Sequence, residues 1–178
     1  PEKTLRHSIS VSSWADAVAA ASGVDREKAA TAGLLHDLGK GFGGKELLKA
    51  AKDMGLDITE TQREKPKLLH GLVAAEECRG LLGIEDEDIL EAIRWHTTGL
   101  PGLGPVGLVL YFADFSEPLR EYLEAPEARR IFEEDGLHEA LCFVAKAKLE
   151  YARRKPPLDP NTEAFGNWLH RIPLLPGV

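Results

Sequence analysis

The segment Leu34–Lys40, LLHDLGK, places His36, Asp37 and Lys40 at the end of a run of small and apolar residues. Polar groups in such a setting need a buried hydrogen-bonded pair, a helix end or a metal ion to satisfy them. A helix turns about 100° per residue, so His36 and Asp37 share one edge of it and can reach one point beside its C-terminal end. One His-Asp pair is a weak signal, so a metal site requires further ligands elsewhere in the chain.

Two further residues have suitable positions. His7 shares a helical stripe with Val11 and Trp14, which face inward. Asp114 lies within the apolar stretch YFADFSEP, where a lone carboxylate is costly to bury. Two imidazoles and two carboxylates on three helices form a plausible mixed nitrogen–oxygen site for iron, manganese, cobalt, nickel or zinc. No cysteine joins this group, which disfavours a structural zinc site.

Two more histidines lie next to glycines. His70 occurs in KLLHGLVAAE, directly before a glycine, and His96 occurs in AIRWHTTG, three residues before one. Each histidine alone is more often a core or capping residue than a functional one. The glycines permit close backbone approach, which favours a ligand pocket in both places. We expect the remaining histidines, His138 and His170, at the surface.

The elements that position these residues are predicted to be helices. Apolar residues recur at helical spacing and no run alternates with period two, which indicates an all-α fold built by helix packing. Residues 41–44, with three glycines, are expected to form a loop, and Asp25 and Asp86 or Asp88 are expected to begin helices. The spacing predicts helices over residues 1–22, 25–40, 45–54, 66–82, 86–96, 106–115, 126–135, 136–154 and 161–171.

Composition narrows the class of protein. The 178 residues, 43% of them hydrophobic, suffice for one domain with a substantial core, which we place at residues 1–155, with a linker and a short helical tail at 156–178 that packs on it. A net charge of −7 disfavours a nucleic-acid partner. No apolar window of about 18 residues predicts a membrane span, and no signal peptide is evident. Cys78 and Cys142 lack metal or redox spacing, so we expect free thiols in the cytoplasm.

The order H…HD…H…H…D resembles that of the HD-domain metal-dependent phosphohydrolases. The segments AGLLHDLGK, LLHG, EDILEAIRWHTTGLPG, LYFADFSEPLR and TEAFGNWL resemble, more narrowly, the bacterial symmetrical diadenosine tetraphosphate hydrolases, the YqeK type. The similarity runs in the same order from about His7 to Leu169. It implies an HD-domain helical bundle with an iron-type ion held by His7, His36, Asp37 and Asp114. It also implies substrate contacts from Lys40, His70, His96, Thr97 and Arg120.

The resemblance implies cleavage of diadenosine tetraphosphate into two ADP, with Asp37, His70 and His96 as the catalytic group. His70 and His96 are candidates for the general acid or for substrate hydrogen bonds, and the sequence does not separate these roles. The near alternative is a nucleotidase or nucleotide phosphodiesterase with the same metal centre. The alternative from another class is a nucleotide-binding module without catalysis. A homodimer is plausible for a small helical protein.

Two cationic positions carry alternatives. The planar fork of Arg120 suits two phosphate oxygens, but an ion pair with Glu117 or Glu121 is an equal alternative on the residues alone. The family usually has an arginine three residues before the first ligand histidine, where this chain has Thr4. Either a neighbouring cation, Lys3 or Arg6, replaces that arginine, or the grip on phosphate is weaker.

Overall fold

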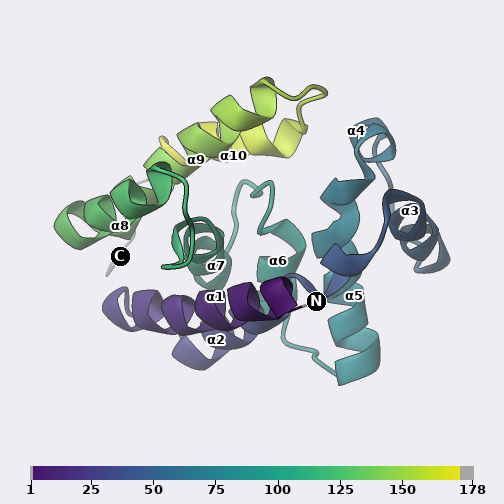
Figure 1. The fold of residues 1–178 in the computed structure, drawn as a ribbon, viewed down its shortest axis with the longest axis horizontal. Coiled ribbons are helices and arrows are strands. Elements are labelled where there is room, and N and C mark those ends of the chain that lie inside the picture. Colours follow the sequence, from purple (N-terminus) through teal and green to yellow (C-terminus); the bar gives the residue numbers. More distant parts are fainter. Residues whose placement is uncertain (1, 173–178) are drawn as a thin grey trace.

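A computed structural model describes residues 2–172, which form ten α-helices and two short 3-10 helices and no strand (Figure 1). The prediction of an all-α fold is therefore confirmed. No helix in the described range has both the length and the apolar character needed to cross a membrane. The helices are α1 Glu2–Ala21, α2 Arg26–Leu35, α3 Gly44–Asp53, α4 Glu60–Glu64, α5 His70–Leu82, α6 Glu87–Trp95, α7 Pro105–Ser116, α8 Glu124–Asp135, α9 Leu137–Arg153 and α10 Pro160–Leu169, with 3-10 helices η1 Leu38–Gly41 and η2 Pro66–Leu69.

Local signals in the sequence account for several helix ends. The Asp25 side chain accepts a hydrogen bond from the main-chain N–H of Lys28 at 3.0 Å and caps α2. Asp86 caps α6 in the same way, so of the two aspartates considered it is the cap. Gly83 ends α5 with a φ of 68°, a left-handed conformation that a glycine adopts without strain.

The structure corrects the prediction at four places. The helix predicted over residues 25–40 ends at Leu35, and the separate 3-10 helix η1 follows from Leu38. The loop expected at residues 41–44 is shorter, because η1 ends at Gly41 and α3 already begins at Gly44. The helix predicted from Pro66 starts instead as η2 and becomes α-helical at His70. The short helix α4 was not predicted; the Thr59 side chain accepts from the main-chain N–H of Gln62 and caps it.

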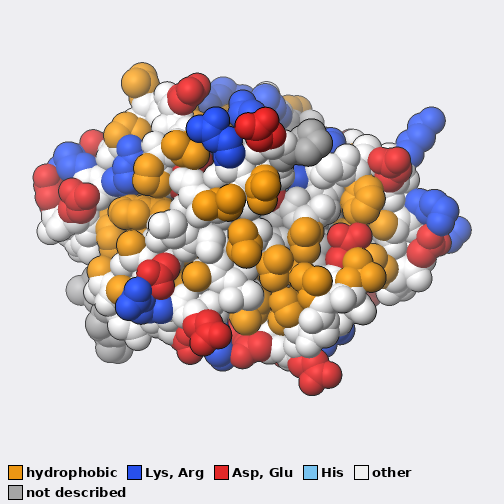
Figure 2. All heavy atoms as spheres, turned by 60° about the horizontal axis from the view of Figure 1, so that its bottom comes forward, with side chains coloured by type: hydrophobic (Ala, Val, Ile, Leu, Met, Phe, Trp, Pro, Cys, Tyr) orange, Lys and Arg blue, Asp and Glu red, His pale blue; other side chains and the backbone are white. Residues whose placement is uncertain are grey.

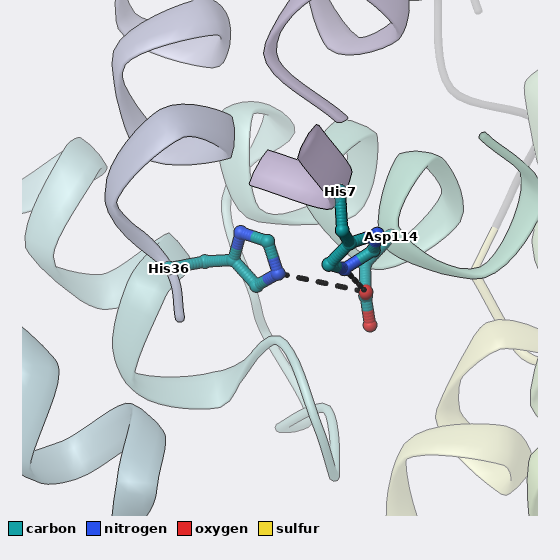
Figure 3. A group of neighbouring side chains, drawn as sticks. All are labelled: His7, His36 and Asp114. Carbon is teal, nitrogen blue, oxygen red and sulfur yellow. Dashed lines mark hydrogen bonds and ion pairs between the residues drawn. The ribbon is translucent and has the colours of Figure 1, made fainter. Parts of the chain in front are cut away.

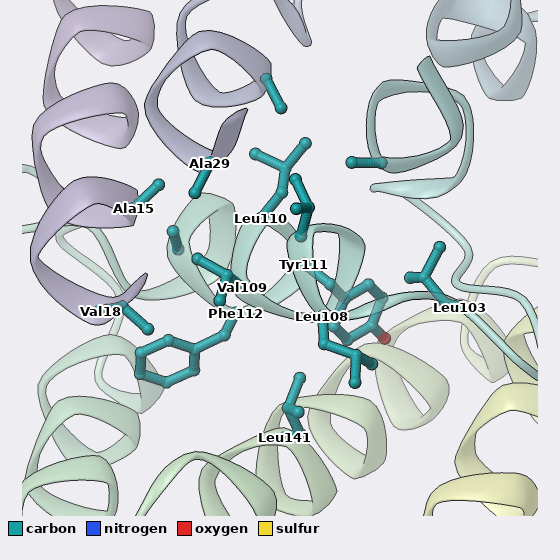
Figure 4. Close-up of a cluster of buried hydrophobic side chains, with 14 of the residues drawn as sticks. Ala15, Val18, Ala29, Leu103, Leu108, Val109, Leu110, Tyr111, Phe112 and Leu141 are labelled. Atoms are coloured by element: carbon teal, nitrogen blue, oxygen red, sulfur yellow. The ribbon is translucent and has the colours of Figure 1, made fainter. Parts of the chain in front are cut away.

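The hydrophobic core surrounds α7, which lies between α1 and α2 on one side and α8 and α9 on the other (Figure 1). Side chains of α7 extend toward Val18 on α1 and toward Leu141 on α9, and Phe112 is fully buried among them (Figure 4). A smaller cluster lies between α3 and α5. Because α7 is enclosed on both sides, the polar residues at its C-terminal end have fixed positions.

The C-terminal helix α10 contributes to this core through the fully buried side chains of Phe165 and Leu169. Gly99, in the turn after α6, has a φ of 72°, and a Cβ atom there would overlap the Phe165 ring. Helix α10 of the predicted tail therefore packs against the turn that follows His96, and residues 173–178 lie outside the described residues. The division of the chain at residue 155 stays a prediction.

Candidate metal and nucleotide site

Three helices bring four of the predicted ligands together. His7 projects from α1, Asp114 from α7, and His36 follows the last residue of α2 (Figure 3). Asp37 is the next residue after His36. Asp114 Oδ1 lies 3.1 Å from His7 Nε2 and 3.5 Å from His36 Nε2. Asp37 Oδ2 lies 3.6 Å from His7 Nε2 and 3.5 Å from His36 Nε2. Residues 107 positions apart in the chain thus converge on one point, as the sequence predicted.

The bonding around this point leaves donor atoms free for a cation. His36 Nδ1 donates to the main-chain oxygen of Gly33 at 2.8 Å, which directs its Nε2 toward the carboxylates. His36 Nε2 and Asp37 Oδ1 are buried without a hydrogen-bond partner, a costly state unless something else binds them. Ligand atoms of His7, His36 and Asp114 lie within 4.8 Å of one another. Two nitrogen and two oxygen donors fit a transition-metal ion such as iron.

The local charges favour the same conclusion. Burial opposes ionisation of Asp114, but His36, His7 and Arg120 outweigh it and hold the pKa of Asp114 well below its usual value. Burial also disfavours a charged His36, yet Asp114 and Asp37 outweigh it and raise the pKa of His36. The Asp114 carboxylate therefore carries negative charge in a buried setting, and this charge attracts a metal cation.

Glu117 and Ser10 support His7 from behind, and neither was predicted. Glu117 Oε1 lies 3.1 Å from His7 Nδ1, and Ser10 Oγ donates to Glu117 Oε2 at 2.5 Å. Glu117 is only 2% exposed. Its carboxylate orients the ring so that Nε2 faces Asp114, a common arrangement behind histidine metal ligands. The signal available in the sequence was the spacing of three residues from Asp114, which places both carboxylates on one side of α7.

Two predicted phosphate-binding cations lie at the same point. Arg120 Nη2 donates to Asp114 Oδ1 at 2.6 Å. Arg120 Nε lies 3.8 Å from Glu117 Oε1. The ion pair with Glu117 that was considered for Arg120 is therefore present, and its binding of phosphate oxygens stays a prediction. Lys40 Nζ lies 2.6 Å from Asp37 Oδ2 and is exposed on its other side. Both cations are in reach of an anion bound near the carboxylates.

His70 and His96 form a second group beside Asp37. Their Nδ1 atoms donate to the main-chain oxygens of Lys67 at 2.6 Å and Ile93 at 2.7 Å. Their Nε2 atoms consequently face each other as acceptors, 3.0 Å apart. Burial lowers the pKa of both rings, that of His96 well below its usual value, so both are neutral near pH 7.

Two hydroxyl and carboxylate oxygens complete this second group. Thr97 Oγ1 lies 3.1 Å from His96 Nε2, and Asp37 Oδ1 lies 3.6 Å from His70 Nε2 and 4.0 Å from His96 Nε2. The close approach that made the glycines informative is present, since a Cβ on Gly71 would lie 2.8 Å from the main-chain oxygen of Ile93. All nine predicted site residues therefore lie in two adjoining groups that share Asp37.

A cavity of about 1000 Å³ opens over the first group. Its polar lining includes the cations Lys3 and Arg6 from the N-terminal turns of α1. Thr4, at the position where the family usually has arginine, also lines it. The lining residues are Glu2, Lys3, Thr4, Arg6, His7, Asp37, Lys40, Glu117, Leu119, Arg120, Glu121 and Tyr122. Lys3 and Arg6, the two expected substitutes for the missing arginine, thus both line this cavity.

Three residues outside the predicted site are two histidines and a lysine. His138 is buried at 8% exposure, so its assignment to the surface was wrong; packing of the first turn of α9 encloses it. His170 is exposed as expected. Lys148 on α9 was not predicted at all, yet its Nζ donates to the main-chain oxygen of His96 at 2.9 Å. Only tertiary packing brings Lys148 on α9 next to His96, so no local pattern in the sequence could predict this contact.

Comparison with known proteins agrees with this geometry. The HD domain family matches residues 4–148. A symmetrical bis(5'-nucleosyl)-tetraphosphatase of Bacillus subtilis strain 168 is 35% identical over 167 residues, covering 92% of this chain and 87% of the relative. One of the same name from Staphylococcus aureus strain NCTC 8325 / PS 47 is 34% identical over 158 residues, covering 87% of this chain and 80% of the relative.

A solved structure is also similar. It is a predicted HD superfamily hydrolase involved in NAD metabolism from Clostridium acetobutylicum, with a TM-score of 0.90 and 34% identity over 95% of this chain and 89% of that one. The resemblance inferred from the sequence motifs is thereby confirmed, both for the family and for its helical fold.

Proposed function

The chain belongs to the HD domain family and is a hydrolase, and from that premise we propose that it cleaves diadenosine tetraphosphate symmetrically into two ADP. The relatives at 34–35% identity that bear the name of this activity support the proposal. The single structural observation that carries it is the convergence of His7, His36, Asp37 and Asp114 beside a cavity with phosphate-binding cations.

We propose that these four residues hold one transition-metal ion, and that the ion is iron. Two imidazoles and two carboxylates are compatible with iron and also with manganese, cobalt, nickel or zinc. When bound, such an ion supplies positive charge that lowers the pKa of water and polarises a phosphoryl group. Asp37 Oδ1, which has no hydrogen-bond partner, and the Nε2 atoms of His70 and His96, which lie 3.0 Å apart, suit a second ion, so metal analysis has two stoichiometries to distinguish.

The residues of the chain perform the remaining work of positioning. Lys40 and Arg120 offer donors to the polyphosphate from two sides of the ligand group. Arginine binds two phosphate oxygens at once, which fixes the orientation of the chain of phosphates for in-line attack. A water oxygen then bonds to the phosphorus second from one adenosine and loses a proton to the surrounding water. The central P–O–P bridge breaks, and the departing ADP carries the bridging oxygen with its negative charge.

The neutral rings of His70 and His96 favour a role in accepting rather than donating a proton. Each ring presents a bare Nε2 to the site because its Nδ1–H is used by a main-chain oxygen. Thr97 Oγ1, 3.4 Å from His70 Nε2, can donate its proton to a ring or to a phosphate oxygen. We therefore propose that His70 and His96 bind the substrate or an ion through Nε2. Either ring could act as a general acid only after its Nε2 has been protonated.

The substrate has two nucleoside ends, and we propose that one of them lies in a neighbouring cavity of about 450 Å³. Arg6 and Leu119 line both cavities, so the two adjoin. Ile9 and Leu119, each about half exposed, offer apolar surface to a purine ring. The volume is in the range of known small-ligand sites.

The experiment is chromatography of the products formed from diadenosine tetraphosphate by protein purified without a metal-binding tag. The proposal expects ADP as the sole nucleotide product and no activity in Asp114→Ala. ATP plus AMP, or cleavage of a mononucleotide while this substrate stays intact, would instead support a nucleotidase or phosphodiesterase. Nucleotide binding with no turnover and no bound metal would support the non-catalytic module.

We further propose a cytoplasmic location, which the two free thiols of Cys78 and Cys142 support.

The homodimer stays a prediction, and we place its contact on the face that carries α1 and α2. Figure 2 shows hydrophobic side chains gathered across the middle of the view that brings this face forward. Exposed Leu5 and Leu34 belong to these two helices. Sedimentation of the purified chain tests the state.

A further inference from the structure

The ammonium group of Lys148 contacts two uncharged groups, a main-chain carbonyl and an aromatic ring. Its Nζ donates to the main-chain oxygen of His96 at 2.9 Å and lies 3.8 Å from the centroid of the Tyr111 ring. Within residues 2–172, no carboxylate pairs with it at ion-pair distance. An ammonium group has three N–H donors, and burial without an opposite charge is costly. Lys148 therefore retains an unneutralised charge and unused donors.

The charged groups that act on Lys148 belong to the site. Burial lowers the pKa of Lys148 to about 8, Asp114 opposes this, and Arg120 and Lys40 add to it. Lys40 pairs with Asp37 at 2.6 Å and Arg120 pairs with Asp114 at 2.6 Å. Of these three cations, Lys148 is the one whose charge has no carboxylate partner in the part of the chain that the structure describes.

We propose that Lys148 binds a phosphate group of the nucleotide substrate beside His96 and Thr97. The inference rests on the proposed function, because it requires a polyphosphate substrate in this site. The hydrogen bond to the His96 carbonyl keeps Nζ next to the turn that carries the Thr97 hydroxyl. A phosphate oxygen there neutralises the ammonium group and accepts a free N–H, and such charge-assisted bonds are about twice as strong as neutral ones.

Three variants separate charge from structural support. Lys148→Gln retains N–H donors for the carbonyl of His96 but removes the charge. Lys148→Arg retains both. Lys146→Gln is the matched control, since Lys146 lies on the same helix two residues earlier and is exposed. If Lys148→Gln has a weakened helical signal, Lys148→Met replaces it, because its apolar stem still covers the Tyr111 ring.

The measurement is calorimetric titration of the purified, metal-containing full chain with ADP. We expect Lys148→Gln to raise the dissociation constant about tenfold, because one charge-assisted hydrogen bond is lost. We expect Lys148→Arg to stay within about threefold of the unsubstituted chain, and Lys146→Gln to leave binding unchanged. Unchanged ADP affinity in a folded Lys148→Gln or Lys148→Met would overturn the inference and leave Lys148 as a cap for α6.

The readout is independent of turnover. If the chain does not cleave diadenosine tetraphosphate but Lys148→Gln still weakens ADP binding, the proposed function is wrong and the inference stands. If cleavage occurs and the unsubstituted chain and Lys148→Gln bind ADP with the same affinity, only the inference is wrong.

Discussion

The two ends of α7 differ in what they contribute to the molecule. Along most of the helix, Val109, Leu110 and Phe112 are fully buried against apolar neighbours. At the C-terminal end, Asp114 and Glu117 face histidines and an arginine. Burial of one large apolar side chain stabilises a fold by about 1.5–3 kcal/mol, whereas a buried carboxylate is costly unless paired. The apolar part of α7 therefore stabilises the fold, and this fixes the positions of Asp114 and Glu117 at its C-terminal end.

This difference means that stability and activity should respond separately to substitution. Proteins commonly give up stability at a functional site, because the site holds charges and unpaired polar atoms that a purely structural region would exclude. The unpaired atoms of His36 and Asp37 are an instance. Four substitutions test the separation, in order of decreasing expected effect.

The largest effect is expected for Asp114→Ala, with His36→Ala as a parallel variant. Each removes a proposed metal ligand while the apolar end of α7 stays intact, so activity should fall by about a thousandfold or more. The far-ultraviolet circular dichroism signal should remain. Cleavage of diadenosine tetraphosphate measures the first quantity. Turnover at a near-normal rate in either variant would remove that residue from the site.

Phe112→Ala affects the other end of the helix. The ring packs against Phe132 at a centroid distance of 5.2 Å and against Trp14 at 6.4 Å. Removing it leaves a cavity, which should lower the free energy of unfolding by about 3–5 kcal/mol. Urea denaturation measures this loss. The folded fraction should cleave substrate within about threefold of the normal rate, and a selective loss of activity without a loss of stability would refute the separation.

The sequence was informative where structure is local and uninformative where it depends on packing. The cap at Asp25 and the stop at Gly83 follow from side-chain and backbone preferences of a few residues. The convergence of His7 with Asp114 was predicted from residue types on apolar helices and from the family pattern. The burial of His138 and the approach of Lys148 to His96 depend on where α9 packs, which no local pattern specifies.

Gly99→Ala tests the link between the tail and the site. The added Cβ overlaps the Phe165 ring and the backbone φ of 72° is strained for alanine, so we expect a loss of about 2–4 kcal/mol in the free energy of unfolding. Gly102→Ala is the control, since its φ of 88° is also positive but nothing lies within 4 Å of the new atom. Equal stability of the two variants would show that the Phe165 contact is unimportant. Thermal denaturation compares them.

The smallest effect is expected for Glu117→Gln. The amide oxygen still accepts a hydrogen bond from His7 Nδ1, but the negative charge behind the ring is lost. Such supporting residues typically change metal affinity 10–100-fold, and we expect the lower end, about tenfold, because the hydrogen bond to His7 is retained although the one from the main-chain N–H of Leu119 is lost. Competition with a chelator measures the affinity. Unchanged affinity would mean that Glu117 only packs against α1.

The central claim is that residues from α1, the end of α2 and α7 hold one metal ion. An anomalous difference map from crystals of protein purified without added metal tests it most directly. We expect a peak at coordination distance, about 2.0–2.2 Å, from the nitrogen atoms of His7 and His36 and from the Asp37 and Asp114 oxygens. Metal-containing crystals with the peak elsewhere, or with no peak between these side chains, would contradict it.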